Sequence, residues 1–306
     1  MFLPSSRQIA GTLRGNARTR NCGALIKTDR LQFLALSCAV VLGAACADAP
    51  TVASATNADI PVVAAPIKYG QLDGAKHPAV VLIIMDVDGA PAFRCSGMLI
   101  APKFVLTAGH CTGEPGELSA IRVFTEADVE HGNNNYPFAG LNTVEATSWS
   151  SHPAFTEAAF FLHDVGVIEL ASPITLLPSN YGVLPTLNQL DALKPSAAIT
   201  FTTVGYGLQF VNPAKVVAEK VRMFATPHLV QINTGFTGAG SLILSNNART
   251  GGSCFGDSGG PNLLGTSRVI AGVTSFGLNG SCAGTGGVFR VDRADVLAYI
   301  NSIVTP

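Results

Sequence analysis

Two short stretches of this chain, far apart in sequence, contain residues that could together perform acyl transfer. Residues 256–261 read Gly-Asp-Ser-Gly-Gly-Pro and residues 107–111 read Thr-Ala-Gly-His-Cys. A serine hydroxyl is a poor nucleophile at neutral pH, so Ser258 needs a base within hydrogen-bond reach, and His110 is the candidate. Asp164, in a His-Asp-Val-Gly-Val-Ile stretch between them, is the candidate for the carboxylate that orients this base. The combination predicts a nucleophilic serine site.

The glycines around Ser258 allow a sharp turn that aims backbone N–H groups at one point, as the oxyanion of acyl transfer requires. Taken with the histidine motif and the order His, Asp, Ser, this loop resembles that of the chymotrypsin/trypsin-like serine peptidases. The segments Gly-Tyr-Gly at 205–207 and Thr-Ser-Phe-Gly at 274–277 are also similar to the family's. The resemblance covers about Ile67 to Pro306, and it implies two antiparallel β-barrels with the site in the cleft between them.

The resemblance also implies a role for each matching residue, and the general account of the Ser-His-Asp triad was itself drawn from this family. Ser258 is expected to be the nucleophile, and His110 the general base and later the acid. Asp164 is expected to orient the imidazole, with support from the Ser275 hydroxyl. The backbone N–H groups of Gly256 and Ser258 are expected to form the oxyanion hole.

The primary specificity pocket can be compared with the family in the same way. Gly252 stands six residues before the serine, where trypsin-like members have an aspartate that binds Lys or Arg. Its absence predicts a preference for uncharged, mainly apolar residues before the scissile bond. The expected substrate-binding residues are Gly252, Ser253, Ser275, Phe276, Gly277 and Gly287.

The start of the resembling region predicts a zymogen. Residues 67–70 read Ile-Lys-Tyr-Gly, which partly resembles the Ile-Val-Gly-Gly start of mature members. In this family a new α-amino group, here that of Ile67, pairs with the aspartate beside the serine, here Asp257. Pro66 precedes Ile67, so an activator of trypsin-like specificity is not expected to cut there.

Composition indicates a large globular core and argues against nucleic-acid binding. The 306 residues are 47% apolar and 13% charged, which is enough for one or two domains. The formal net charge is −1, and the body of the chain has no basic run to form an electrostatic footprint for nucleic acid.

The N-terminus has the pattern of an export signal. Residues 1–30 are basic and residues 31–47 are almost wholly apolar, so we interpret residues 1–47 as a secretory signal segment. Cleavage after a small-x-small sequence ending at Ala47 gives a soluble product that is secreted or periplasmic. Processing at a lipoprotein-like box instead gives a lipidated Cys46, and an uncleaved anchor is the third alternative. A membrane is an expected partner only if Cys46 is lipidated.

The cysteines agree with export. Three of the seven, Cys22, Cys38 and Cys46, lie in or beside the signal, and an even number remains in the body of the chain. Four cysteines allow three pairings, and sequence leaves these open. The resemblance implies two disulfides, Cys95 with Cys111 and Cys254 with Cys282. No CxxC pair or other ligand spacing is present, so we expect no metal and no cofactor.

Local patterns predict an all-β chain with a C-terminal helix. Residues 48–66 indicate a linker or propeptide, residues 67–185 a first β-barrel, and residues 186–306 a second barrel with the helix. Short apolar runs between turn residues predict the strands, at Ala79–Met85, Gly97–Ala101, Val105–Ala108, Ile121–Thr125, Val165–Leu170, Ile199–Val204, Val216–Phe224, Ser241–Leu244, Val269–Phe276 and Val288–Val291. Asp292 is the predicted N-cap of the helix, in which Val296, Ile300 and Ile303 form an apolar stripe.

The sequence therefore predicts a monomeric, secreted serine endopeptidase that acts on proteins or peptides and is open to protein inhibitors. The alternative from another class is a catalytically silent, protease-like binding protein. Such proteins usually lack a triad member or the serine loop. This chain has all three triad residues and the serine loop.

Overall fold

The computed structural model describes residues 66–235 and 237–304. The predicted signal segment, its cleavage and lipidation sites, and the linker before residue 66 lie outside these ranges. Among the described residues, no helix combines the length and the apolar character that a membrane span requires.

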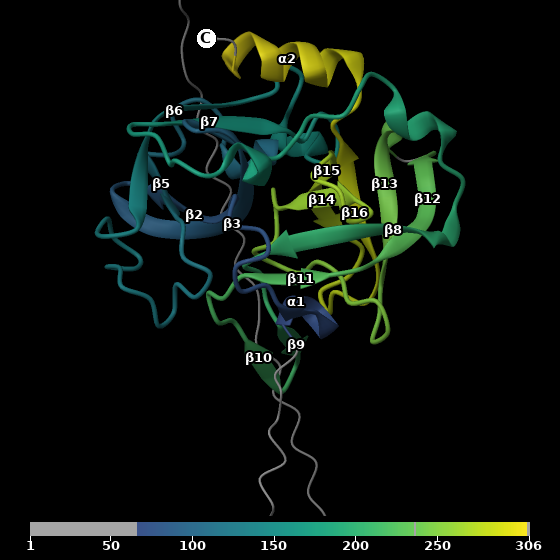
Figure 1. Ribbon diagram of the computed structural model, residues 1–306, viewed down its shortest axis with the longest axis horizontal. Helices are drawn as coiled ribbons and strands as arrows, with labels where there is room; N and C mark the ends of the chain where they lie inside the picture. Colours follow the sequence, from purple (N-terminus) through teal and green to yellow (C-terminus); the bar gives the residue numbers. More distant parts are fainter. Residues whose placement is uncertain (1–65, 236, 305–306) are drawn as a thin grey trace, which may run out of the picture. The chain divides into compact units, whose positions relative to one another are not determined.

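The first β-barrel is closed by six antiparallel strands in the order β2-β3-β4-β7-β6-β5. The strands are β2 (Val80–Val87), β3 (Ala90–Ala101), β4 (Phe104–Thr107), β5 (Ala120–Phe124), β6 (Thr143–Ser151) and β7 (Gly166–Leu170). Strand β2 is buried over almost its whole length. Figure 1 shows this barrel beside the second one.

The second barrel follows the order β8-β12-β13-β16-β15-β14, and pairing of β14 with β8 closes it. Its strands are β8 (Ser196–Gly205), β12 (His228–Thr234), β13 (Gly238–Asn246), β14 (Pro261–Leu264), β15 (Ile270–Gly277) and β16 (Gly284–Arg290). Strand β11 (Met223–Ala225) adds to β8, and β1 (Gln71–Leu72) adds to β11. A separate hairpin joins β9 (Phe210–Asn212) to β10 (Lys215–Val217). The predicted two-barrel fold is confirmed.

Short helical segments lie before, within and between the barrels, and one of them carries His110. They are α1 (Pro66–Tyr69), η1 (Gly109–Cys111), η2 (Glu157–Ala159), η3 (Pro178–Asn180) and η4 (Gln189–Ala192). Ile67 and Lys68 in α1 have non-helical backbone angles, so this segment is an irregular turn rather than a regular helix.

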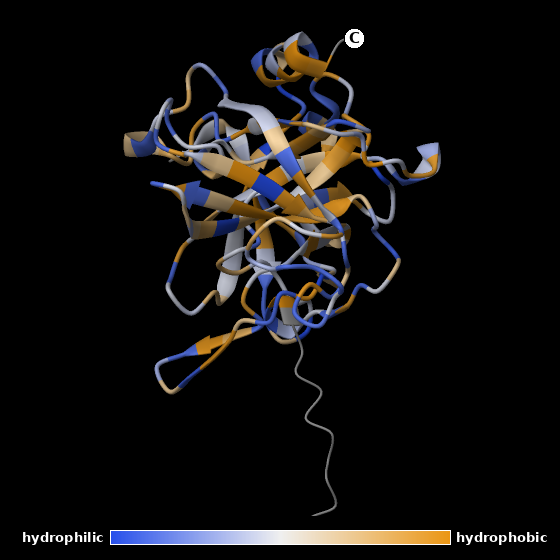
Figure 2. Ribbon diagram, turned by 90° about the vertical axis from the view of Figure 1, so that its left-hand side faces the viewer, coloured by the Kyte–Doolittle hydropathy of each residue, from blue (hydrophilic) through white to orange (hydrophobic). Residues whose placement is uncertain are grey.

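The hydropathy colours of Figure 2 show that the apolar residues concentrate on the strands.

The C-terminal helix α2 (Ala294–Val304) buries Val296 and Ile300 against the main core, as its predicted stripe requires. The prediction that Asp292 is its N-cap is wrong. The Asp292 carboxylate instead binds the buried Arg290 guanidinium at 2.8 and 2.9 Å and accepts the Leu190 N–H at 2.8 Å. A buried arginine is unfavourable without a charged partner. The Asp292 carboxylate pairs with Arg290 and therefore does not cap the helix.

Some strands differ from the predicted pattern. The predicted strand Val216–Phe224 is two strands, β10 and β11, separated at residues 218–222. Strands β6, β12 and β14 were not predicted. Strand β6 is mostly polar and only partly buried, and β14 is short and follows directly on two glycines, so neither gives a clear apolar alternation.

Polar contacts at the barrel junction bind the two halves together. The Arg222 guanidinium pairs with Asp73 at 2.9 Å and donates to the Val80 carbonyl at 2.9 Å, so it links the β11 edge to β2. The Tyr206 hydroxyl, which follows β8, donates to the Glu126 carbonyl at 2.7 Å, and burial raises its pKa to about 12. These buried groups are paired, as low-dielectric surroundings require.

Candidate active site

His110 and Asp164 are held together at one end of the first barrel. His110 lies in η1, shortly after β4 ends, and Asp164 lies two residues before β7 begins. The His110 Nδ1 atom lies 2.9 Å from Asp164 Oδ2, and the His110 backbone N–H donates to Asp164 Oδ1 at 3.0 Å. Because Nδ1 faces a carboxylate, it carries the proton, and Nε2 is left with a lone pair.

The second barrel reaches the same carboxylate. The Ser275 hydroxyl, on β15, donates to Asp164 Oδ2 at 2.5 Å, as expected from sequence. Asp164 is fully buried. Burial of the His110 ring lowers its pKa, but the charge of Asp164 and its hydrogen bond more than offset burial, and the pKa of His110 is raised overall.

The serine loop connects β13 to β14 and binds to strand β3 of the first barrel. Ser96 donates its N–H to the Ser258 carbonyl at 2.8 Å and its hydroxyl to the Gly256 carbonyl at 2.9 Å. Among the described residues, the N–H groups of Gly256 and Ser258 find no acceptor. Both amides therefore remain able to bind an oxygen atom of a ligand.

Gly259 allows the serine loop to approach the histidine loop. Its φ of +76° favours glycine, and an added Cβ would lie 1.9 Å from the Thr107 hydroxyl and 2.7 Å from the Ala108 backbone nitrogen. Ser258 and His110 consequently line the same cavity of about 360 Å³. The described residues include no hydrogen bond between their side chains, and such contacts are often loose in ligand-free sites.

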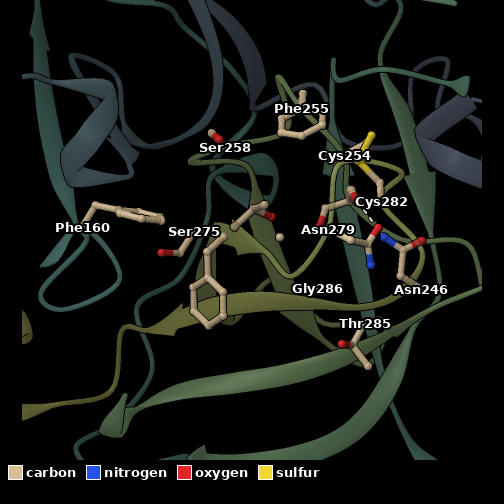
Figure 3. A pocket seen from close by; sticks show the side chains of 14 residues that line it. Phe160, Asn246, Cys254, Phe255, Ser258, Ser275, Asn279, Cys282, Thr285 and Gly286 are labelled. Atoms are coloured by element: carbon tan, nitrogen blue, oxygen red, sulfur yellow. Dashed lines mark hydrogen bonds between the residues drawn. A yellow bond between two sulfur atoms is a disulfide. The ribbon is translucent and has the colours of Figure 1, made fainter. Parts of the chain in front are cut away.

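A second cavity, of about 250 Å³, opens beside Ser258 (Figure 3). Four residues predicted to bind substrate line it, namely Ser253, Ser275, Phe276 and Gly277. The other two, Gly252 and Gly287, are not among its lining residues. A Cβ at Gly252 would overlap Asn246, and one at Gly287 would overlap the Phe276 ring, so both glycines make room for neighbouring side chains.

Several side chains of this cavity could not be predicted from the sequence. Asn246 ends β13, and Phe160 approaches from the first barrel (Figure 3). No motif surrounds either residue, and their place depends on how the two barrels pack. The lining residues not predicted include Phe160, Asn246, Phe255, Asn279 and Thr285.

The chain matches the family model described as Trypsin over residues 75–297. It is 26% identical to the serine protease Hayan of Drosophila melanogaster over 258 residues, which cover 77% of this chain and 38% of Hayan. Among solved structures it resembles HL collagenase, with a TM-score of 0.60, 21% identity, and coverage of 78% of this chain and 99% of the collagenase. It also resembles the scabies mite inactivated protease paralogue S-D1, with a TM-score of 0.59, 18% identity, and coverage of 78% and 97%.

The chain belongs to the trypsin family. The family model spans both barrels and includes the histidine and serine motifs. The two solved structures, at this level of identity, establish the fold alone. One of them is an inactivated protease paralogue, so this fold does not by itself establish turnover.

Two disulfides reinforce the loops of this trypsin-family site. Cys95 on β3 is bonded to Cys111 in η1, beside His110. Cys254 in the serine loop is bonded to Cys282, which precedes β16. Of the three pairings open to four cysteines, the structure has the one that the resemblance implied. Each bond typically adds about 2 to 4 kcal/mol to the stability of a fold.

Asp257 is a fully buried carboxylate with no ion-pair partner among the described residues. It accepts the Gly207 N–H at 2.7 Å and the Cys254 N–H at 2.8 Å. A Cβ on Gly205 or Gly207 would lie within 2.4 Å of this carboxyl group, which explains the glycines of the Gly-Tyr-Gly segment. Burial raises the pKa of Asp257 to about 6.

The segment that begins at Ile67 packs near the base of the second cavity. The Ile67 side chain is fully buried with Val221, Met223 and Ala225, at a φ of +37° that is unfavourable for a β-branched residue. The next residue, Lys68, accepts the Gly252 N–H at its carbonyl, at 3.2 Å.

Two groups of side chains among the described residues come close enough to share a metal ion, Cys95 with His110 and Cys111, and His152 with His163 and Asp295. In the first group the sulfurs are joined in a disulfide. In the second, His152 Nδ1 accepts the Ala154 N–H at 3.1 Å, so Nε2 carries the proton of the neutral ring. Neither group offers the three free ligands of a zinc site.

The close approach at Gly259 leads to a prediction on stability. Gly259→Ala should lower the free energy of unfolding by about 3 kcal/mol or more, because the new methyl group meets backbone as well as the Thr107 hydroxyl. Gly265→Ala is the matched control. Its φ of +59° is similar, but nothing lies within 4 Å of the added Cβ, so a loss of about 1 kcal/mol is expected. Urea unfolding measures both, and equal losses would contradict the steric explanation.

Proposed function

We propose that this protein is a serine endopeptidase that hydrolyses peptide bonds of proteins or peptides through an acyl-enzyme. One observation carries the proposal. His110, which is paired with Asp164, and Ser258 line one cavity, beside two backbone amides that have no acceptor among the described residues. Each triad residue could have a structural role alone, but the combination is what acyl transfer requires.

The proposed reaction has two halves. In the first, Ser258 Oγ attacks the substrate carbonyl carbon while its proton passes to His110 Nε2, and Asp164 stabilises the imidazolium. The N–H groups of Gly256 and Ser258 bind the oxyanion, a contribution of about 2.7 to 4 kcal/mol for one such donor. His110 then protonates the leaving amine as the C–N bond breaks. In the second half, His110 accepts a proton from water as the water oxygen attacks the ester carbonyl carbon; the bond from this carbon to Ser258 Oγ then breaks, His110 returns the proton to Oγ, and the acid is released.

The second cavity, of about 250 Å³, supports a preference for uncharged, mainly apolar side chains before the scissile bond. The described residues that line it include Phe255, Phe276 and the Cys254–Cys282 disulfide, and none of them is acidic or basic. A buried Lys or Arg side chain would lack a charged partner there, which is costly. Faster cleavage of Lys or Arg reporter peptides would contradict this preference.

We further propose export and activation by cleavage. The basic and apolar N-terminus, together with two disulfides, fits a secreted, periplasmic or lipid-anchored product. A new α-amino group at Ile67 would supply the ion-pair partner that buried Asp257 lacks among the described residues, and cleavage before Ile67 would relax the unfavourable φ of Ile67. The active form is then expected to begin at Ile67 and to act as a monomer.

The first prediction on activity concerns Ser258. The purified full chain, after proteolytic processing, should react with a fluorophosphonate probe and cleave peptides, whereas Ser258→Ala should do neither. Ser253→Ala, which changes a second serine of the same pocket, is the matched control and should still be labelled. Absence of labelling in the processed wild-type protein would favour the catalytically silent alternative. Labelling without peptide cleavage would indicate an esterase.

The second prediction concerns pH. His110 must be neutral to accept the Ser258 proton, so kcat/KM should rise with pH through the pKa of His110. Because Asp164 raises this pKa overall, the midpoint should lie above the ordinary histidine value of about 6.5. A pH profile of kcat/KM for one reporter peptide measures it. A midpoint below that value would contradict the charge stabilisation proposed for Asp164.

The third prediction concerns Asp257 in the uncleaved chain. A carboxyl group whose folded-state pKa is about 6 instead of 3.8 favours the folded chain below about pH 4 and loses that contribution as the pH rises to 6. The difference corresponds to roughly 3 kcal/mol. Asp257→Asn should therefore flatten the fall in unfolding free energy between pH 4 and 6, measured by urea unfolding.

Cleavage before Ile67 should also remove this pH dependence, because the new amino group would lower the pKa of Asp257. Asp191→Asn is a suitable control, since hydrogen bonding to Arg290 lowers the pKa of Asp191 and its contribution is lost as the pH falls instead. An unchanged pH dependence after cleavage would contradict the proposed pairing.

A further inference from the structure

Two cavities adjoin Ser258, and the proposed reaction gives them different occupants. His110 lines the cavity of about 360 Å³ but not the one of about 250 Å³. Because His110 protonates the leaving amine, the residue that carries this amine lies beside the imidazole. The cavity of about 360 Å³ is therefore the leaving-group cavity, which holds the side chain of the first residue after the scissile bond.

The lining of the leaving-group cavity is apolar where it is buried and acidic where it is exposed. Its buried side chains are those of Met85, Cys95 and Leu118. Glu117 and Glu157 line the same cavity and are exposed. Lysine and arginine side chains suit such a lining, because their methylene stems pack on apolar surface while the charged ends stay near water.

The two carboxylates of this cavity have no cation as a partner. Among the described residues, Glu157 forms no hydrogen bond or ion pair through its carboxylate, and that of Glu117 accepts only the Glu114 N–H at 3.0 Å. Burial raises the pKa of Glu157, the charge of Glu117 raises it further, and the charge of His110 lowers it. Both carboxylates are thus close enough to repel each other, and Glu157 is close to the imidazole.

Arg94 also lines this cavity, but its charge lies on the side of the serine loop. Its Nη1 donates to the Ala218 carbonyl at 3.1 Å, and an added Cβ on Gly256 would lie 2.9 Å from its Nε. Arg94 does not contribute to the pKa shift of Glu157, whereas His110 does. The part of the cavity beside His110 therefore keeps a negative potential that a cation of the substrate can neutralise.

We propose that Glu117 and Glu157 determine specificity on the leaving-group side, by attracting a basic side chain on the first residue after the scissile bond. This inference rests on the proposed peptidase function and adds to its preference for an apolar residue before that bond. Lysine and arginine both fit, since the stem packs on Met85 and Leu118 and the charged end lies beside the carboxylates. An acidic side chain in the same place is repelled.

Peptides that share phenylalanine before the scissile bond and differ only in the next residue test the proposal with the processed full chain. Lysine is compared with norleucine, which has the same stem without the charge, and with glutamate. The wild-type enzyme should show kcat/KM about fivefold higher for lysine than for norleucine, and a lower value for glutamate. In about 1 M salt the ratio of lysine to norleucine should fall towards 1, because charges in an open cavity are screened. Mass spectrometry of the products verifies which bond is cut.

Substitutions that remove one charge at nearly constant shape assign the effect. Glu117→Gln and Glu157→Gln should each lower the ratio of lysine to norleucine about twofold, and the double variant should bring it close to 1. Glu145→Gln is the matched control, because Glu145 lies on β6 and lines neither cavity, so it should keep the wild-type ratio. Both peptides use the same His110 within each variant, so a change in its pKa does not alter the ratio. Fluorophosphonate labelling of Ser258 verifies that each variant is folded and active.

The outcomes separate this inference from the proposed function. Equal cleavage of the lysine and norleucine peptides by labelled wild-type enzyme would overturn the role of the two carboxylates while leaving the peptidase function intact. A preference for lysine that persists in the double variant or in high salt would do the same. Absence of all labelling and cleavage in the wild-type protein would overturn both.

Discussion

The site depends on one buried charge that the two barrels share. The Asp164 carboxylate comes from the first barrel, orients His110 on the same barrel, and accepts a hydrogen bond from Ser275 on the second. A buried carboxylate without partners would be strongly unfavourable, so correct packing of the barrels and correct orientation of the histidine stabilise each other. Ser96 adds a second link by binding both carbonyls of the serine loop.

Asp257 is a second buried carboxylate near Ser258, and its hydrogen-bond and charge partners differ from those of Asp164. Asp257 has two backbone donors but no ion-pair partner among the described residues, and burial raises its pKa by more than the charge of Arg94 lowers it. In the activation that we propose, the α-amino group of a cleaved chain would be this partner. On this account the two carboxylates beside the serine loop differ in state: Asp164 is already paired before processing, while Asp257 awaits its partner.

The motifs identified residues that the fold brings together, but they did not predict the shape of the cavities around them. His110, Asp164 and Ser258 stand in local sequences specific enough to recognise, and the cysteine pairing followed from the resemblance. Asn246, which lines the second cavity, could not be found in this way, because its position depends on packing against Gly252. Strand β6 was missed because it is largely polar and partly exposed, and Asp292 left the helix end because buried Arg290 requires its charge.

The central claim is that Ser258 forms a covalent acyl intermediate. Its most direct test is mass spectrometry of the processed protein, mixed with an activated ester substrate and quenched in acid within the first turnovers. The account predicts a mass increase equal to one acyl group, located on the peptide that contains Ser258 and lost on longer incubation. No adduct during turnover, or an adduct on another residue, would contradict it.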